Sequence, residues 1–267
     1  MRFLLPPSPS LDIAKAHAPT LRALLAARVK DIVVDVAADY GALGDDVVAG
    51  RCVAAWVPPI VGARVEMAGG RVVLRALRQG QTAYRAAIVC RQGFALDVKQ
   101  ASQLTAAWVD EDSAAGYLLA RSWLMGNHHI DAITGFRAAF FVGGYVQALE
   151  AVASGKADLT SVFASVAAAM PRTTLDEVDP ALRAKLAVVG YTGDTRSDGV
   201  AIGQGIDDGA ARPLIDALAA LSSSAEGQAI LSSLMQADGL RREAPKPTST
   251  SLQALLMAEA HRLRAGS

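Results

Sequence analysis

The stretch W-V-D-E-D-S-A-A-G-Y, residues 108–117, decides how this sequence is interpreted. It continues the short apolar run Leu104–Val109 and contains an acidic turn, small residues and Gly116. A helical pattern begins directly after it, at Tyr117. The stretch is therefore expected to be a strand, a tight loop and the start of a helix. Free N–H groups at a helix start, together with the positive end of the helix dipole, favour a polar or anionic ligand.

Size and composition are those of a globular α/β protein. The chain has 267 residues, of which 52% are hydrophobic and 19% charged, enough for one large or two medium domains with full cores. The 26 basic and 26 acidic residues cancel and no basic tract occurs, so no nucleic-acid partner is expected. The sequence contains no apolar run of about 18 residues, so no membrane-spanning segment is expected.

The N-terminal segment and the cysteines bear on location and redox state. Residues 1–10 hold only a short apolar piece followed by prolines, so no export signal is expected in the sequence as written. This fits a cytoplasmic protein, or an exported one that has been trimmed. Cys52 and Cys90 lie in apolar, strand-like runs and are expected to be buried free thiols. No Cys/His spacing is typical of zinc, and neither a metal nor a cofactor is expected.

Predicted strands and helices alternate along the chain, which implies parallel sheets with helices on their faces. Strands are expected at 2–5, 31–36, 52–57, 72–78, 84–91, 105–109, 136–142, 157–163 and 186–191. Helices are expected at 11–28, 43–49, 61–68, 99–104, 115–125, 145–154, 175–177, 180–185, 207–221, 225–235 and 252–264.

Polar, aromatic and small residues flank the ends of several predicted strands. In open parallel sheets, ligands bind beyond the carboxyl ends of the strands, so two such units are expected to enclose a ligand cleft at their boundary. The candidate ligand contacts are Ser8, Ser10, Tyr40, Pro58, Tyr84, Asp110, Ser113, Ala114, Ala115, Gly116, Tyr117, Tyr145 and Asp194.

Several of these residues also have a simple structural interpretation. Ser113 could be an ordinary helix N-cap, whose side chain satisfies free N–H groups. Tyr40, Tyr84 and Tyr145 could pack against the sheets instead of contacting a ligand. Trp56 lies in an apolar run and is expected in the core.

Taken in order, the motifs resemble those of the phosphate/phosphonate-type substrate-binding proteins of ABC transporters, which have the type 2 periplasmic-binding-protein fold. The similarity rests on D-Y at 39–40, V-A-A-W-V-P-P at 53–59, Y-R-A-A-I-V from Tyr84, D-x-x-S-A-A-G-Y from Asp110, and G-G-Y-V-Q-A-L-E-A-V-A-S-G-K-A-D at 143–158.

The resemblance implies an α/β fold of two lobes, each a mostly parallel sheet flanked by helices, joined by two hinge strands. Lobe 1 would contain residues 1–90 and 195–267, and lobe 2 residues 91–194. Binding of a small molecule would close the lobes, as in other hinged binding proteins. The resemblance also implies a periplasmic or extracytoplasmic monomer that delivers its ligand to an ABC transporter permease.

Two departures from the family pattern bear on the ligand. The family's loop has a run of Ser and Thr whose hydroxyls hold phosphonate oxygens, whereas this chain keeps Ser113 and has Ala114 and Ala115. Tyr145 stands where the family usually has a histidine. Because fewer donors compensate the desolvation of a dianion, we expect a less charged and flatter ligand than a phosphonate.

Two other functions are compatible with this fold. One is a cytoplasmic enzyme of small-molecule metabolism, because some relatives of the fold are enzymes. Against it, no Ser-His-Asp or Cys-His set has a supporting motif and a G-x-S-x-G elbow is absent, so no catalytic residue is predicted. The other is a sensor or scaffold with a diverged cleft, which Ala114 and Ala115 would fit.

Overall fold

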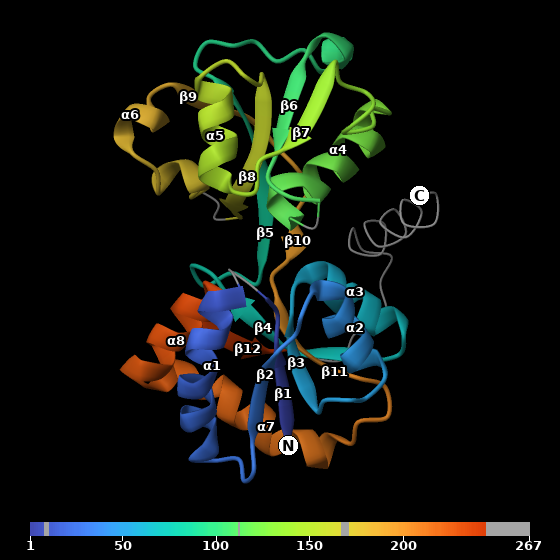
Figure 1. The fold of residues 1–267 in the computed structure, drawn as a ribbon, viewed down its shortest axis with the longest axis vertical. Helices are drawn as coiled ribbons and strands as arrows, with labels where there is room; N and C mark the ends of the chain where they lie inside the picture. The colour runs from blue at the N-terminus through green and yellow to red at the C-terminus, as the bar shows by residue number, and fades with distance from the viewer. Residues whose placement is uncertain (8–10, 112, 167–170, 244–267) are drawn as a thin grey trace. The chain divides into compact units, whose positions relative to one another are not determined.

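Figure 1 shows the computed structural model of the chain, in which residues 1–7, 11–111, 113–166 and 171–243 are described. The chain forms two compact units. Unit 1 contains Met1–Thr82 and the described residues from Arg196 onward, and unit 2 contains Ala83–Thr195. The lobe boundaries expected after residues 90 and 194 stay a prediction.

The sheet of unit 1 is mixed, with strand order β12-β4-β11-β3-β1-β2. Strand β1 is parallel to β2 and β3, whereas β11 is antiparallel to β3 and β4, and β12 is antiparallel to β4. The strands are β1 (Arg2–Leu5), β2 (Val33–Val36), β3 (Ala54–Val57), β4 (Arg71–Leu77), β11 (Gly199–Ile202) and β12 (Gly239–Arg242).

Helices cover both faces of this sheet, and the alternation of side chains along β1 shows how. Phe3 and Leu5 join the core cluster that includes the buried faces of α1, α7 and α8, while Leu4 joins the cluster of α2 and α3. The helical segments are α1 (Leu11–Ala26), α2 (Tyr40–Val48), α3 (Pro59–Met67), α7 (Asp208–Ala219), the short η4 (Leu221–Ser223) and α8 (Ala225–Met235).

The sheet of unit 2 is also mixed, with order β10-β5-β8-β6-β7, and β9 pairs with β5 as well. Strand β6 is parallel to β7 and β8, and β5 is antiparallel to β8 and β9. The strands are β5 (Ala83–Arg91), β6 (Thr105–Trp108), β7 (Ala138–Phe141), β8 (Leu159–Ser165), β9 (Leu186–Tyr191) and β10 (Thr195–Arg196).

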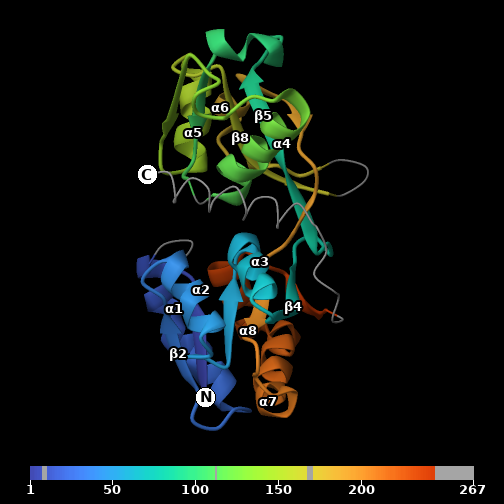
Figure 2. The same ribbon diagram turned by 90° about the vertical axis from the view of Figure 1, so that its right-hand side faces the viewer.

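Helices again pack on both sides, and Figure 2 shows α4 and α5 on opposite faces of this sheet. Helix α5 covers the cluster that includes Ala87, Val89 and Val162. The helical segments are η1 (Val98–Gln103), the π-helical turn η2 (Ala114–Leu118), α4 (Leu119–His128), α5 (Tyr145–Ala153), η3 (Thr174–Asp176) and α6 (Pro180–Arg183).

The observed elements confirm much of the sequence analysis and correct part of it. Strands 2–5 and 186–191 and helix 225–235 have the predicted bounds. The expectation of mostly parallel sheets holds for β3-β1-β2 and β7-β6-β8, and needs correction elsewhere. Strands β11 and β12 were not predicted, and they return to unit 1 antiparallel to its first strands. The expected helix at 252–264 lies outside the described residues.

The described helices were also compared with the requirements of a membrane span. None of them is both long enough and apolar enough to cross a bilayer.

Candidate functional site

The loop after β6 is built by backbone hydrogen bonds around a glycine. Ser113 Oγ accepts from Gly116 N at 3.2 Å, Ser113 N donates to Asp110 O at 3.1 Å, and Val109 N donates to Gly116 O at 3.2 Å. A Cβ at residue 116 would lie 2.5 Å from the Val109 Cβ and 2.6 Å from Ser113 Oγ. Only glycine fits this turn, so the tight loop predicted from the small residues is confirmed.

Aromatic rings pack together next to this loop. Trp108 is fully buried and donates from Nε1 to Ala132 O at 2.9 Å. The Tyr117 ring lies 5.8 Å from the Trp108 ring and 5.0 Å from the Phe141 ring, and Tyr117 is only 3% exposed. The structure thus shows Tyr117 in a packing role, and ligand contact by this residue stays a prediction.

A second helix begins beside this loop. Val142 N and Gly143 N donate to Trp108 O and Val109 O at 2.9 and 2.8 Å, which ties the end of β7 to the end of β6. Gly143 has φ +86°, and Gly144 is then the N-cap of α5, without a side-chain cap. Since β6 and β7 are parallel, two helix starts lie at the same edge of the sheet.

This edge of unit 2 offers backbone hydrogen-bond donors at two helix starts. Neither η2 nor α5 has an acidic residue in its first turn, and the first N–H groups of a helix have no partner within it. Ala114 and Tyr145 are half-buried there, whereas Ala115 is buried. Asp110 and Glu111, by contrast, are exposed acidic residues on the approach to η2. The edge therefore combines backbone donors with nearby negative charge.

Tyr84 belongs to the same edge of unit 2. Its partner across β5 and β8 is Ser165, the last residue of β8, and β8 is parallel to β6. Tyr84 is 5% exposed and its ring lies 5.5 Å from that of Phe163. Asp194 is exposed in the segment between β9 and β10.

In unit 1, two further candidates lie at one edge of the sheet. Strands β1, β2 and β3 are parallel, so their carboxyl ends share an edge. Tyr40 is the first residue of α2, and Pro58 is the N-cap of α3. Both are half-buried, and Tyr40 packs against the core cluster of α2 and α3. Ser8 and Ser10 lie outside the described residues.

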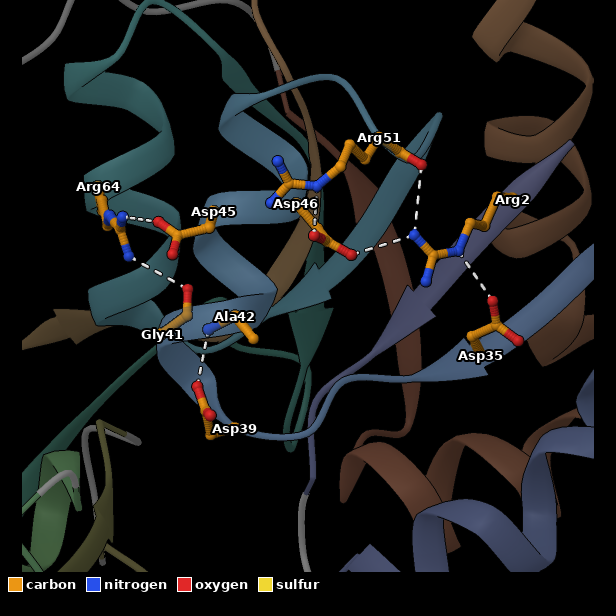
Figure 3. A network of polar contacts seen from close by, with 9 residues as sticks. All are labelled: Arg2, Asp35, Asp39, Gly41, Ala42, Asp45, Asp46, Arg51 and Arg64. Carbon is orange, nitrogen blue, oxygen red and sulfur yellow. Dashed lines mark hydrogen bonds and ion pairs between the residues drawn. The ribbon is translucent and has the colours of Figure 1, made fainter.

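Side chains hold the start of α2 in place (Figure 3). Asp39 is its N-cap, and Asp39 Oδ1 accepts from Ala42 N at 2.7 Å. Arg64 reaches across from α3, donates from Nη1 to Gly41 O at 3.3 Å and pairs with Asp45. The D-Y motif at 39–40 belongs to this helix start, whereas Arg64 was not among the predicted residues. An Asp before a helix signals a cap, whereas no local pattern reveals Arg64.

A second set of ion pairs fixes the other part of α2. Arg51 and Arg2 both donate to Asp46, at 2.7 and 3.1 Å, and Arg2 also donates to Asp35 at 2.8 Å. The hydrogen bond from Arg51, assisted by Arg2, holds the pKa of Asp46 below its usual range, although burial opposes this. The hydrogen bond to Asp35 raises the pKa of Arg2. These charges neutralise one another.

The cysteines and possible metal ligands were located as well. Cys52 and Cys90 are buried free thiols, as predicted. Burial raises the pKa of Cys52 to about 11 and that of Cys90 to about 12, so both are poor nucleophiles. Within the described ranges, no three His, Cys, Asp or Glu side chains come together in a group that could hold a metal ion.

Comparison with known proteins identifies one matching family. The family described as the periplasmic substrate-binding protein of the ABC phosphonate transporter matches residues 3–245. Among curated proteins, none matches the chain.

Similar solved structures include three bacterial proteins. One from Xanthomonas citri, solved with ATP, has a TM-score of 0.74 and 18% identity over 98% of both chains. A phosphonate transporter binding protein from Pseudomonas aeruginosa has a TM-score of 0.66 and 16% identity, covering 100% of this chain and 98% of the other. PhnD1 from Prochlorococcus marinus, in complex with methylphosphonate, has a TM-score of 0.69 and 13% identity, with the same coverage. These likenesses confirm the predicted two-lobed fold.

Proposed function

Because the chain belongs to the family of periplasmic substrate-binding proteins of ABC phosphonate transporters, we propose that it binds a small organic anion less charged than a phosphonate dianion. The family is one of binding proteins and not of enzymes. The chain is thus a solute-binding protein. The proposal concerns its ligand, the residues that contact it, and delivery of the ligand to an ABC permease.

One observation carries the proposal. In unit 2, the starts of η2 and α5 lie at the carboxyl ends of the neighbouring parallel strands β6 and β7, and neither has an acidic first turn. Backbone N–H groups at such starts bind anionic oxygens without a basic side chain. We assign contact to Ser113, Ala114 and Tyr145 at this edge.

Two features support a low charge on the ligand. The stretches 108–117 and 142–147 contain no Lys, Arg or His, whereas Asp110 and Glu111 are exposed beside η2. A second negative charge on the ligand would thus meet repulsion without a matching cation in these two stretches. Ala114 and Tyr145 offer apolar surface instead, which suits an ester or a planar group. The ATP bound to the Xanthomonas protein indicates that a large ligand with a flat base belongs in the test.

Calorimetry with ligands of graded charge tests the proposal, at a pH above the second pKa of methylphosphonate so that this compound is a dianion. The set is methylphosphonate, its monomethyl ester, its neutral dimethyl ester, inorganic phosphate and ATP. We expect the singly charged monomethyl ester to bind at least tenfold more tightly than methylphosphonate, and to raise the melting temperature as the logarithm of its concentration. Low-micromolar binding of methylphosphonate, or equal binding of the neutral ester, would contradict the assigned charge.

Variants test the residues. Ser113→Ala and Tyr145→Phe each remove one hydroxyl donor, and both are expected to weaken ligand binding several-fold although Tyr145→Phe keeps the apolar ring. Ser154→Ala is the matched control, because Ser154 lies at the opposite end of α5, where its hydroxyl donates to Ala151 O at 3.2 Å. If Ser113→Ala and Tyr145→Phe leave the affinity unchanged, these two residues do not belong to the site.

A further inference from the structure

The helix that begins with Tyr40 has a sequence of low intrinsic helix propensity. Helix α2 has nine residues, Y-G-A-L-G-D-D-V-V, and two of them are glycines. Glycine is the poorest helix former after proline, and a helix this short does not form alone in water. Packing of Leu43 and Val47 holds the buried face of α2. The first turn, which carries Tyr40, needs additional contacts.

Arg64 supplies such contacts from a different helix. Its guanidinium donates to Gly41 O at 3.3 Å and pairs with Asp45, so it joins the first and second turns of α2 to α3 (Figure 3). The Gly41 carbonyl lies one residue after Tyr40. Fixing this carbonyl limits the backbone rotations that would turn the Tyr40 ring away from the sheet edge.

The glycines of α2 make room for these contacts. A Cβ at residue 44 would lie 3.0 Å from Arg64 Nη1 and 3.4 Å from its Cδ. A Cβ at residue 41 would lie 3.1 Å from Asp39 Oδ1, the atom that caps Ala42 N. The residues that weaken α2 as a helix are therefore those that let Arg64 and Asp39 approach it closely.

We infer that Arg64 is a positioning residue for Tyr40 in ligand binding. Arg64 lies in α3, which begins directly after Pro58, so the same side chain couples the two candidate loops of unit 1. The guanidinium of Arg64 is directed to Gly41 and Asp45, so the role that we infer for it is exerted through α2. The inference rests on the proposed solute-binding function and on the ligand contact predicted for Tyr40 from the sequence.

Amide hydrogen exchange tests the positioning without any ligand. In the full chain, Arg64→Met is expected to accelerate exchange at residues 42–45 roughly tenfold relative to wild type, and Arg64→Lys to restore part of the protection. Arg51→Met is the matched control, since it removes an ion pair from the same helix at Asp46. Unchanged exchange at 42–45 in Arg64→Met would overturn the inference.

A double-mutant cycle tests the link to binding, with whichever of methylphosphonate, its monomethyl ester, phosphate or ATP binds the wild type. Tyr40→Ala and Arg64→Met are each expected to weaken binding about five- to tenfold, and the double variant to be no weaker than Tyr40→Ala alone. Additive losses would show that Arg64 acts independently of Tyr40 and overturn the inference. So would a Tyr40→Ala variant of unchanged affinity.

The two proposals fail separately. If none of the four compounds binds, the proposed ligand class fails, and hydrogen exchange alone decides the role of Arg64. If the monomethyl ester binds more tightly than methylphosphonate and Ser113→Ala weakens its binding while Arg64→Met does not, the proposed function stands and the positioning role falls.

Discussion

The candidate loops of the two units are held by different forces. In unit 2, the turn at Ser113–Gly116 is fixed by backbone hydrogen bonds and rests on the buried rings of Trp108 and Tyr117. In unit 1, the first turn of α2 is fixed by side chains, Asp39 and Arg64, that are partly exposed. Dense packing resists added volume, whereas partly exposed ion pairs are weakened by salt and pH. The unit 2 loop should therefore be sensitive to volume, and the unit 1 loop to charge.

The largest expected effect is that of Gly116→Ala. The new Cβ would lie 2.5 Å from the Val109 Cβ, in a loop with no free space. We expect a loss of about 1–3 kcal/mol in the free energy of unfolding, measured by urea denaturation. Gly126→Ala is the control, because nothing lies within 4 Å of its Cβ position in the same helical segment, and it should be neutral or stabilising by up to about 1 kcal/mol. Equal losses in the two variants would contradict the packed-loop interpretation.

Removing the N-cap side chain at either helix start is expected to cause the next largest loss of stability. Asp39→Ala removes a 2.7 Å bond to Ala42 N from a turn with few other contacts, and should cost about 1 kcal/mol of stability. Ser113→Ala removes a 3.2 Å bond in a turn that three backbone bonds also hold, and should cost about half as much. Thermal unfolding of both variants measures the difference. A larger loss for Ser113→Ala would reverse the comparison.

The same contrast explains which parts of the site could be predicted from the sequence. The turn at Ser113 was predictable because its cap, its glycine and its helix start lie within four consecutive residues. The acidic-then-small pattern after Val109 predicted the loop. Contacts of this range are decided by local conformational preferences, which the sequence displays directly.

Long-range contacts were not predictable in this way. The Arg64 bonds join residues separated by 19 and 23 positions, and an Arg in an amphipathic helix usually faces solvent. Strand β12, G-L-R-R, has no apolar alternation, and it pairs with β4 only because the chain returns to unit 1. Tyr84 lies at the same edge as the other candidates of unit 2 because of its antiparallel register with β8, which its motif alone does not show.

The pH dependence of folding stability is the next expected difference between the two units. The pKa of Asp46 in unit 1 is lowered first by Arg51. Burial raises the pKa of Asp131 in unit 2, but hydrogen bonds from Thr134 and Ile133 outweigh it. Both folded-state pKa values lie below the unfolded value of about 3.9, so each carboxylate stabilises above that pH and loses its contribution as pH falls through the folded pKa.

Asp46→Asn and Asp131→Asn should each flatten the acid side of the stability curve below about pH 4, by up to about 1 kcal/mol. Because Asp46 is paired with charged side chains and Asp131 mainly with N–H groups, 1 M NaCl should reduce the effect of Asp46→Asn much more. Equal salt dependence of the two variants would remove this distinction between the units.

The smallest effect is on thiol reactivity, and it compares the units without changing either loop. With pKa values of about 11 and about 12, Cys52 and Cys90 are thiolates at pH 8 in only about one molecule in 10³ and 10⁴, and both are buried. Labelling therefore requires local opening of the structure. Cys52 lies just before β3 in the cluster packed against α2, whereas Cys90 lies within β5, hydrogen-bonded to β8 and β9. We expect iodoacetamide to label Cys52 first, with Cys52→Ala and Cys90→Ala assigning the two phases by mass spectrometry. Faster labelling of Cys90 would mean that the structure around β5 in unit 2 opens more readily than the structure around α2 in unit 1. That result would contradict our expectation that the region held by partly exposed ion pairs opens first.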